Sequence, residues 1–353
     1  MAKKLRVALL FGGRSAEHDV SITSAAAIYT HLDKSRFDIT CVYANRQGGW
    51  RTVETPQAPA EVLRQGEFTS FLPWAPQNRD DRFEADIFFP VLHGPFGEDG
   101  TVQGLFELAG VAYVGATVLA SAAGMDKAVA KTLFQSRGLP VGHFDVVLEQ
   151  DWRADPEILL RSIREAYAPP FFVKPANLGS SIGISRVITH AEIEDAFETA
   201  FRYDRKILVE EGISGREIEC SVLGNDEPLA SLPGEVIPSR EFYDYRDKYL
   251  EGKTRFGIPA ELPEQLTEEI RRLSVEAFKA VDGCGMARVD FFVQEGTERI
   301  ILNEINTIPG FTQISMYPKL WEASGLGFAA LLEELIELGL ERHANRKRDV
   351  EWT

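Results

Sequence analysis

Leu5–Phe11 (LRVALLF) is an apolar run that ends at Gly12 and Gly13, and it sets the expected fold of the first part of the chain. A run without regular polar alternation predicts a strand buried on both faces of a parallel sheet. Together with the elements that follow, it predicts an open parallel α/β unit over residues 1–124. Those elements are a helix at Ser21–Leu32, strands at Phe37–Tyr43 and Asp86–Leu92, and a helix at Thr101–Leu108.

The rest of the chain predicts two α+β units, at residues 125–213 and 214–353. The first contains expected helices at Asp126–Arg137 and Ala191–Tyr203 and strands at His143–Leu148, Phe171–Lys174, Ile184–Ile188 and Lys206–Glu210. The second contains expected strands at Arg216–Leu223, Leu229–Glu235, Met286–Val293 and Arg299–Ile305 and helices at Pro263–Val281 and Gly327–Arg342. Segment 54–82 is rich in proline and polar residues, and segment 240–256 has no clear period, so both are expected to be surface loops.

The composition limits the classes of function. The chain has 353 residues, of which 44% are hydrophobic, so two or three compact units are expected and global disorder is excluded. With 38 Lys and Arg against 54 Asp and Glu, the net charge is −16, so no nucleic-acid partner is expected. No apolar run reaches the roughly 18 residues that span a bilayer. The three cysteines form no CxxC pair, and we expect a cytoplasmic protein without a membrane partner.

The strongest chemical signal is Arg288-Val289-Asp290 followed by Asn303–Asn306 (NEIN). Gln294–Glu298 contains Gly296 and predicts a hairpin turn between two strands. A turn centred on Thr297 places Asp290 opposite Glu304 and Arg288 opposite Asn306. The other face of this hairpin is expected to be core, and it consists of Val289, Phe291, Val293, Ile301 and Ile305.

The paired acids of this hairpin need a compensating charge. Two carboxylates about 5 Å apart repel by roughly 3 kcal/mol at an effective dielectric constant of about 20. Asp290, Glu304 and Asn306 supply only oxygen donors, which suit Mg²⁺ and not zinc or copper. The alternative is that Arg288 bridges both acids in a structural ion network. The hairpin alone supports these two interpretations equally.

The segment Lys174–Ser181 (KPANLGSS) ends an apolar strand with a lysine and continues as a loop of small residues. Such a loop can bring backbone N–H groups close to phosphate oxygens, with Lys174 as a point charge. The same loop contains Gly179–Gly183, which matches the GxSxG motif of serine hydrolases. That motif requires a helix after the serine, whereas residues 184–188 predict a strand, so the hydrolase remains a weak rival.

Six short motifs in order resemble the D-alanine–D-alanine ligase family of the ATP-grasp superfamily. They are Phe11–Ser21 (FGGRSAEHDVS), His93–Gly100 (HGPFGEDG), Met125–Lys127 (MDK), Lys174–Ser181, Tyr243–Tyr249 and Asn303–Gly310 (NEINTIPG). The resemblance implies an N-terminal α/β domain followed by two α+β subdomains that enclose ATP beneath a lid at 240–256. It implies ATP-dependent joining of two D-alanine molecules through a D-alanyl phosphate, for peptidoglycan precursors. D-Serine or D-lactate as second substrate stays an alternative, and a homodimer is expected.

The resemblance also implies the residue roles. The nucleotide is expected at Lys127, Lys174, Ser180, Ser181 and Lys248, with its ribose at Glu210 and Glu217 and its adenine at the backbone of Glu211 and Ile213. Mg²⁺ or Mn²⁺, usually two ions, is expected at Asp290, Glu304 and Asn306. The first D-alanine is expected at Glu17 and His93, and the carboxylate of the second at Ser315 and the Met316 backbone. Arg288 and the Gly310 N–H are expected to stabilise the tetrahedral oxyanion. Glu17, Ser180 and Tyr249 are expected to be joined by hydrogen bonds when the lid closes.

Overall fold

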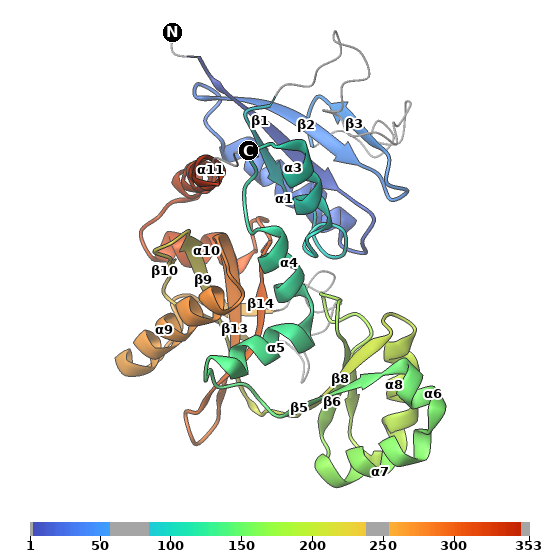
Figure 1. The fold of residues 1–353 in the computed structure, drawn as a ribbon. Helices are drawn as coiled ribbons and strands as arrows, with labels where there is room; N and C mark the ends of the chain where they lie inside the picture. The colour runs from blue at the N-terminus through green and yellow to red at the C-terminus, as the bar shows by residue number, and fades with distance from the viewer. Residues whose placement is uncertain (1–2, 57–84, 238–253, 347–353) are drawn as a thin grey trace, which may run out of the picture.

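The computed structural model (Figure 1) describes residues 3–56, 85–237 and 254–346. Within these residues the strands form three sheets, which are covered by helices. The predicted order, an α/β unit followed by α+β units, is confirmed. None of the described helices combines the length and the apolar character that a membrane crossing requires.

The first sheet has the strand order β3-β2-β1-β4. Its elements are β1 (Leu5–Gly12), α1 (His18–His31), β2 (Phe37–Ala44), β3 (Trp50–Val53), β4 (Ile87–Pro90) and α3 (Thr101–Ala109). Strand β1 pairs in parallel with β2 and β4 and is buried from Val7 onward, as the apolar run predicted. The sequence did not predict β3, an antiparallel edge strand. Gly12 ends β1 with φ +96°, where a Cβ atom would lie 2.2 Å from the Ala44 carbonyl oxygen.

The central sheet has the order β5-β8-β6-β7. Its elements are β5 (Phe144–Leu148), α6 (Glu149–Ala154), α7 (Pro156–Ala166), β6 (Phe171–Pro175), β7 (Ser185–Val187), a 3-10 turn at His190–Glu192, α8 (Ile193–Phe201) and β8 (Lys206–Glu211). Residues of α7 and α8 form a separate core against one face of this sheet. Helices α6 and α7 were not predicted, although Asp155 caps α7 and Pro156 stands at its first position.

The C-terminal sheet has the order β12-β11-β9-β13-β14, with β10 beside β9. Its strands are β9 (Gly215–Gly224), β10 (Leu229–Ala230), β11 (Gly234–Ile237), β12 (Arg255–Gly257), β13 (Gly285–Gln294) and β14 (Ile300–Asn306). The helices around it are α4 (Val118–Met125), α5 (Lys127–Ser136), α9 (Glu264–Ala280), α10 (Met316–Ala323) and α11 (Phe328–Asn345). Helices α4 and α10 were not predicted.

Two predictions in this sheet are wrong in part. The expected strand Leu229–Glu235 is two strands, β10 and β11, separated by a segment that contains Pro233. Proline has no N–H to donate to a ladder, so the strand is interrupted there. The expected loop 240–256 ends inside strand β12, which pairs with β11. Residues 240–253 of that loop, like most of the 54–82 excursion, lie outside the described residues.

The hairpin of β13 and β14 confirms the predicted pairs, Arg288 with Asn306 and Asp290 with Glu304. The register then shifts, because Phe291 pairs with Leu302 and leaves Asn303 as an extra residue. One inserted residue reverses the direction of every side chain beyond it. Leu302 therefore joins the core next to Val289 and Phe291. Ile301 is buried, as predicted, but it pairs with Phe292 on the opposite face, so only its predicted face is wrong.

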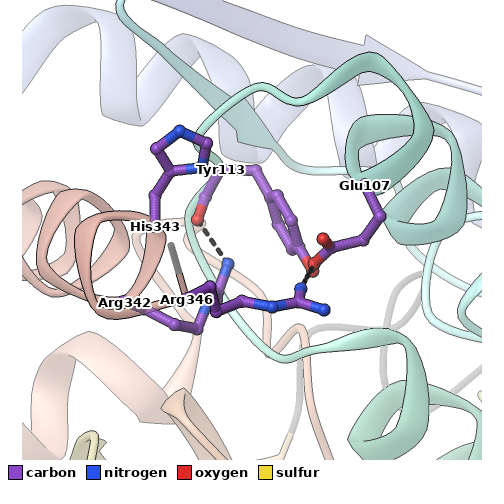
Figure 2. A pocket seen from close by; sticks show the side chains of 5 residues that line it. All are labelled: Glu107, Tyr113, Arg342, His343 and Arg346. Atoms are coloured by element: carbon purple, nitrogen blue, oxygen red, sulfur yellow. Dashed lines mark hydrogen bonds and ion pairs between the residues drawn. The ribbon is translucent and has the colours of Figure 1, made fainter. Parts of the chain in front are cut away.

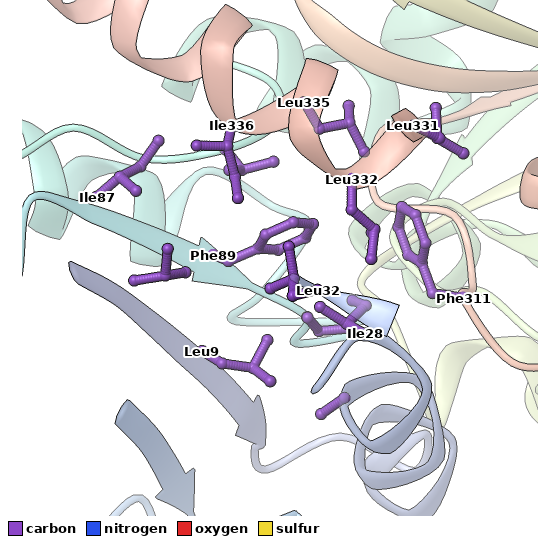
Figure 3. Close-up of a cluster of buried hydrophobic side chains, with 14 of the residues drawn as sticks. Leu9, Ile28, Leu32, Ile87, Phe89, Phe311, Leu331, Leu332, Leu335 and Ile336 are labelled. Atoms are coloured by element: carbon purple, nitrogen blue, oxygen red, sulfur yellow. The ribbon is translucent and has the colours of Figure 1, made fainter. Parts of the chain in front are cut away.

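The first and last parts of the chain share one core (Figure 3). Leu332 and Ile336 of α11 pack with Leu9 and Phe89 of the first sheet, and Phe311 completes the contact. Segment 118–136 is likewise joined to the C-terminal sheet, because α4 and α5 contact β14. The central sheet, by contrast, keeps a core of its own beginning at β5. The C-terminal sheet and the central sheet are thus anchored differently in the molecule.

The C-terminal end of α11 borders a cavity of about 290 Å³, and side chains that line this cavity hold the helix in place (Figure 2). The buried guanidinium of Arg342 donates to the Tyr113 carbonyl oxygen at 2.7 Å and lies 4.2 Å from the Tyr113 ring centre. Arg346 pairs with Glu107, which also accepts a hydrogen bond from the Tyr113 hydroxyl at 2.6 Å. The charges that line this cavity are therefore engaged in holding α11 to α3 and its following loop.

Candidate functional site

Three loops from different parts of the chain meet at Glu17. The Ser180 hydroxyl donates to Glu17 Oε1, which joins the loop after β6 to the start of α1. Gly94, after β4, approaches so closely that a Cβ atom there would lie 2.8 Å from Glu17 Oε2. Gly94 has φ +76°, so glycine satisfies both its conformation and this contact. The structure therefore brings Glu17 and Ser180 together, as the sequence predicted.

Lys127 joins the central and C-terminal sheets. It begins α5, and its ammonium donates to the Leu178 carbonyl oxygen at 2.8 Å and lies 3.3 Å from Glu304 Oε2. Leu178 belongs to the loop that carries Ser180, and Glu304 lies on β14. The predicted phosphate loop and the predicted metal hairpin therefore face each other across this lysine.

The C-terminal sheet presents an acidic surface around Arg288. The Arg288 guanidinium donates to both Asp290 oxygens at 2.7 Å, and its Nε lies 3.0 Å from Glu219 Oε2. Glu219 is the partner of Asp290 on β9, so it lies on the same face. Burial would lower the pKa of Arg288, but the charges of Asp290 and Glu219 hold it well above its ordinary value. Arg288 is consequently a permanent charge among acids.

The donor chemistry of Asp290, Glu304 and Asn306 fits a hard divalent cation. Asp290 and Glu304 are cross-strand partners, and Asn306 lies two residues beyond Glu304 on the same face. The Ile308 N–H donates to Asn306 Oδ1 at 3.0 Å, which orients this amide. Among the described residues, no cluster of three or more His, Cys, Asp or Glu side chains surrounds a common metal position. A cation would therefore also need oxygens from a substrate, as Mg²⁺ commonly does with phosphates.

The inward surface of the central sheet is basic. Lys174 Nζ lies 2.8 Å from Glu210 Oε2, and Lys131 Nζ lies 3.5 Å from Glu210 Oε1. Burial opposes the ionisation of Glu210, but Lys131 and Lys174 outweigh it and lower the pKa of this carboxyl. Burial also acts against Lys174, yet the charge and hydrogen bond of Glu210, with Glu304 and Glu217, raise its pKa. The carboxylates of Glu217 on β9 and Glu304 on β14 thus interact electrostatically with Lys174 across the site.

His93 is buried behind Glu17 with protein partners on both ring nitrogens. Nδ1 lies 3.1 Å from the Ile308 carbonyl oxygen and 3.5 Å from Glu98 Oε1, and Nε2 lies 3.1 Å from Ser24 Oγ. Burial lowers the pKa of His93, but the hydrogen bond and charge of Glu98, helped by Glu17, outweigh it and the pKa is raised. A contact with a substrate carboxylate would require one of these bonds to break, and that role stays a prediction.

Gly310 and Ser315 lie next to each other in space, in the loop that leads into α10. A Cβ atom at position 310 would lie 2.7 Å from Ser315 Oγ, and Ser315 Oγ accepts the Thr312 N–H at 2.9 Å. Ser315 is the residue before the helix, and Met316 is its first residue. The N-terminal N–H groups of a helix bear partial positive charge and bind carboxylates. Phe311 connects this loop to His93 through Ser24. The Phe311 N–H donates to Ser24 Oγ at 3.2 Å, and the same Ser24 Oγ lies 3.1 Å from His93 Nε2.

The positions predicted for the adenosine part of ATP lie on β8, on β9 and, for Ile213, in the loop between them. The Glu211 side chain accepts the His143 N–H at 2.7 Å, which fixes the chain next to Ile213. Glu217 lies opposite Phe292 and shares its face with Glu219. Glu210 is buried and bound to two lysines, so its predicted ribose contact stays a prediction. Tyr249 and Lys248 lie outside the described residues.

The rival serine-hydrolase site lacks its structural context. Ser180 and Ser181 have φ values of 51° and 59°, and the next regular element is strand β7 rather than a helix. A nucleophile elbow is a turn from a strand into a helix. The strained serines instead belong to the loop that meets Glu17 and Lys127, and backbone strain of this kind is found at ligand sites.

Two charged residues of this region, Glu219 and Lys131, were not predicted from the sequence. Glu219 could have been found, because Glu217 and Glu219 alternate with apolar residues along a predicted strand and must share a face. Lys131 stands four residues after Lys127, which places both on one face of the predicted helix. Its burial could not be foreseen, because an isolated helical lysine is usually exposed.

Comparisons with known proteins agree over nearly the whole chain. Family models described as D-ala D-ala ligase N-terminus and C-terminus match residues 6–116 and 133–337. A D-alanine–D-alanine ligase from Solibacter usitatus is 51% identical, covering 98% of both chains, and one from Bacillus velezensis is 45% identical, covering 96% of this chain and 98% of that protein. The solved D-alanine–D-alanine ligase from Coxiella burnetii has a TM-score of 0.87 and 39% identity, covering 98% of this chain and 96% of that one.

A second solved structure matches almost as well. The D-Ala:D-Ser ligase from Enterococcus faecalis has a TM-score of 0.83 and 35% identity, covering 96% of this chain and 100% of that one. These likenesses confirm the fold class and the family resemblance predicted from the sequence motifs.

Proposed function

The chain belongs to the D-alanine–D-alanine ligase family, and on that basis we propose how its residues catalyse the reaction. The reaction joins two D-alanine molecules for peptidoglycan precursor synthesis, with conversion of ATP to ADP and phosphate. In the proposed path the first carboxylate attacks the γ-phosphorus to form D-alanyl phosphate, and the amine of the second D-alanine then displaces phosphate. The observation that carries this proposal is the meeting of Glu17, Ser180, Lys127 and Glu304, which joins all three parts of the chain.

The basic side of the site is suited to the phosphates. Lys127, Lys174 and the loop of Ser180 and Ser181 supply the positive charge and the backbone N–H groups. Phe172 lies on the same face of β6 as Lys174, and on the C-terminal sheet Phe292 lies on the same face of β13 as Asp290. These rings are suited to the adenine base, whose edge is expected at the backbone of Glu211 and Ile213, with Glu217 at the ribose.

The acidic side is suited to divalent cations. Asp290, Glu304 and Asn306 would hold Mg²⁺ or Mn²⁺, which, when bound together with ATP, neutralises phosphate charge and polarises the phosphorus–oxygen bonds. A bound cation would compete with Arg288 for the Asp290 carboxylate and with Lys127 for the Glu304 carboxylate. Lys127 would then be available to negative charge on the substrates, as would the part of the Arg288 guanidinium that does not contact Glu219.

Arg288 and the Gly310 N–H would stabilise the tetrahedral oxyanion of the second step. Preorganised charge of this kind often contributes more to catalysis than any other single effect. Glu17 would hold the ammonium group of the first D-alanine, because its carboxylate lies at the junction with the loop of Gly94. Ser315 and the Met316 N–H, at the start of α10, would receive the carboxylate of the second D-alanine.

An acyl phosphate hydrolyses readily, so the site must exclude water while it exists. The Glu17–Ser180 bond supports a closed arrangement, because it already connects α1 with the loop after β6. Tyr249 would join this pair from the lid at 240–256, with Lys248 on the nucleotide. A homodimer is also proposed, from the usual state of the family.

The test is to identify the product after incubation with ATP, Mg²⁺ and D-alanine. We expect D-alanyl-D-alanine and equal amounts of ADP and phosphate, with no ADP when D-alanine is omitted. L-Alanine is the matched control, and equal turnover with it would refute the stereochemistry. D-Serine and D-lactate should be assayed as second substrates, since the similar Enterococcus protein is a D-Ala:D-Ser ligase. Ester cleavage without ATP, with labelling of Ser181 by a fluorophosphonate, would instead support the hydrolase.

A further inference from the structure

A lysine that the proposed mechanism does not use is buried beside the phosphate-binding lysines. Lys131 lies one turn after Lys127 on α5, and only 4% of it is exposed. Its ammonium lies 3.5 Å from Glu210 Oε1 and 6.0 Å from the centre of the Phe144 ring. A buried ammonium is costly unless an acid compensates it, so this position requires explanation.

Glu210 is shared between two lysines. Its second oxygen, Oε2, lies 2.8 Å from Lys174 Nζ, which is the closer of the two contacts. With one carboxylate and two ammonium groups, the cluster carries a formal charge of +1. Burial lowers the pKa of Lys131, Glu210 opposes this, and the charge of Lys174 acts in the same direction as burial. The fold retains this surplus charge close to the loop of Ser180 and Ser181.

Without Lys131, Glu210 and Lys174 would form a closed pair of opposite charges. A phosphate that approached Lys174 would then compete with Glu210, and the carboxylate would lose its nearer counter-ion whenever Lys174 turned toward the phosphate. With Lys131 present, Glu210 keeps a partner throughout. Truncating one partner of a buried charge pair is costly for the same reason, since it leaves the other charge uncompensated.

We propose that Lys131 is a positioning residue for nucleotide binding, which neutralises Glu210 and so leaves the charge of Lys174 available to the phosphate oxygens of ATP. This inference rests on the proposed function, because it assumes that Lys174 contacts phosphate. It assigns Lys131 no contact with the nucleotide, and its effect passes entirely through Glu210 and Lys174.

The experiment compares the binding of ADP and of adenosine by calorimetry in EDTA, so that neither metal nor turnover enters. We expect Lys131→Met to raise the Kd for ADP about tenfold, equivalent to about 1.4 kcal/mol, and to leave the Kd for adenosine within about twofold. Lys131→Arg, which keeps the charge, should restore most of the ADP affinity. Lys206→Met is the matched control, because Lys206 is also largely buried and pairs with Asp126; it should leave the ADP affinity unchanged.

The double variant Lys131→Met/Glu210→Gln separates charge balance from packing. If Lys131 acts by neutralising Glu210, removing both charges restores the surplus of Lys174, and the double variant should bind ADP more tightly than Lys131→Met alone. Additive losses, or equal weakening of ADP and adenosine, would show a structural role and overturn the proposal. An unchanged Kd in Lys131→Met would overturn it as well. If Lys131→Met does not fold, Lys131→Gln and its double variant with Glu210→Gln give the same comparison.

The control for the proposed function is the unmodified protein. If it neither binds ADP nor forms dipeptide, the proposed function fails together with this inference. If it does both and Lys131→Met behaves identically, only the role of Lys131 is refuted.

Discussion

The acidic and basic sides of the site are built alike but carry opposite charge. On the C-terminal sheet, Arg288 lies among the three acids Glu219, Asp290 and Glu304. On the central sheet, one acid, Glu210, lies between Lys131 and Lys174. In each cluster a central charged side chain is surrounded by side chains of opposite charge from adjacent strands or a helix. The surrounding charges outnumber the central one, so each cluster has a net charge of their sign.

The sign of the surplus determines which ligand each side can hold. A surplus of carboxylates attracts divalent cations, and a surplus of lysines attracts phosphate. Lys127 is the contact between the two, since it reaches Glu304 on one side and the Leu178 carbonyl oxygen on the other. A metal–nucleotide complex carries both signs of charge, so it would satisfy both surpluses at once. Single substitutions can alter each side separately.

The largest effect is expected from the acidic side. Asp290→Asn removes one carboxylate charge while preserving shape, and turnover should fall about a thousandfold, since a metal ion contributes several kcal/mol to the transition state. Electron paramagnetic resonance should show weaker Mn²⁺ binding, with a melting temperature close to that of the unmodified protein. The exposed Asp195→Asn is the control. If Asp290→Asn unfolds the protein, the ion-network interpretation replaces the metal site.

The basic side is tested more directly by Lys174→Met than by Lys131→Met. Loss of the lysine that meets the phosphates should raise the Kd for ATP about a hundredfold, which corresponds to the lower range for breaking a buried charge pair. The KM for D-alanine should change much less. Isothermal titration with ATP and steady-state kinetics check this, with the exposed Lys279→Met as control. An equal rise in both constants would indicate a general disturbance rather than a phosphate site.

A smaller effect is expected where the two sides meet the first unit of the chain. Ser180→Ala removes the hydrogen bond to Glu17, and hydrogen bonds to charged groups contribute about 1.5–3 kcal/mol. We therefore expect kcat/KM to fall about tenfold or somewhat more, with a smaller loss of ADP affinity in EDTA, because the variant keeps the backbone N–H groups of this loop. Ser136→Ala, at an exposed position of α5, is the control. Wild-type kinetics in Ser180→Ala would mean that this contact has no part in closure.

The smallest effect concerns His93, whose ring nitrogens lie close to the Ile308 carbonyl oxygen, Glu98 and Ser24. Its pKa is raised in the folded protein, because Glu98 and Glu17 outweigh burial. The stabilisation is therefore fully present below the ordinary pKa of about 6.5 and is lost as the pH rises through the folded value. His93→Gln should lower the free energy of unfolding by about 1 kcal/mol or more at low pH, and by less at high pH.

Urea unfolding of the unmodified protein and of His93→Gln, at pH values below and above the pKa of His93, measures the difference in the free energy of unfolding. The exposed His31→Gln is the control. A difference that stays constant or grows as the pH rises would contradict a raised pKa of His93 in the folded protein. The first two predictions concern ligand binding, whereas this one concerns the stability of the fold.

Much of the site could be predicted because it depends on short segments. The pairing of Asp290 with Glu304 follows from one hairpin turn and the alternation of a strand, and both are properties of neighbouring residues. The same rule gave the wrong face for Ile301, although this residue is buried, because the bulge at Asn303 has no clear signature in the residue types. Local patterns therefore predicted the polar pairs and the buried residues of the hairpin, but not the register beyond Asn303.

Contacts between distant segments were beyond the sequence. The residues alone were enough to predict most strands, the loop of small residues after Lys174, and the family motifs. The packed chain was needed to show that Glu219 lies against Arg288, that Lys131 is buried against Glu210, and that α11 packs on the first sheet. The reason is physical: alternation along a strand determines which side a residue faces, but its neighbour across space depends on how whole elements pack, and that packing minimises the exposed apolar area of the entire chain.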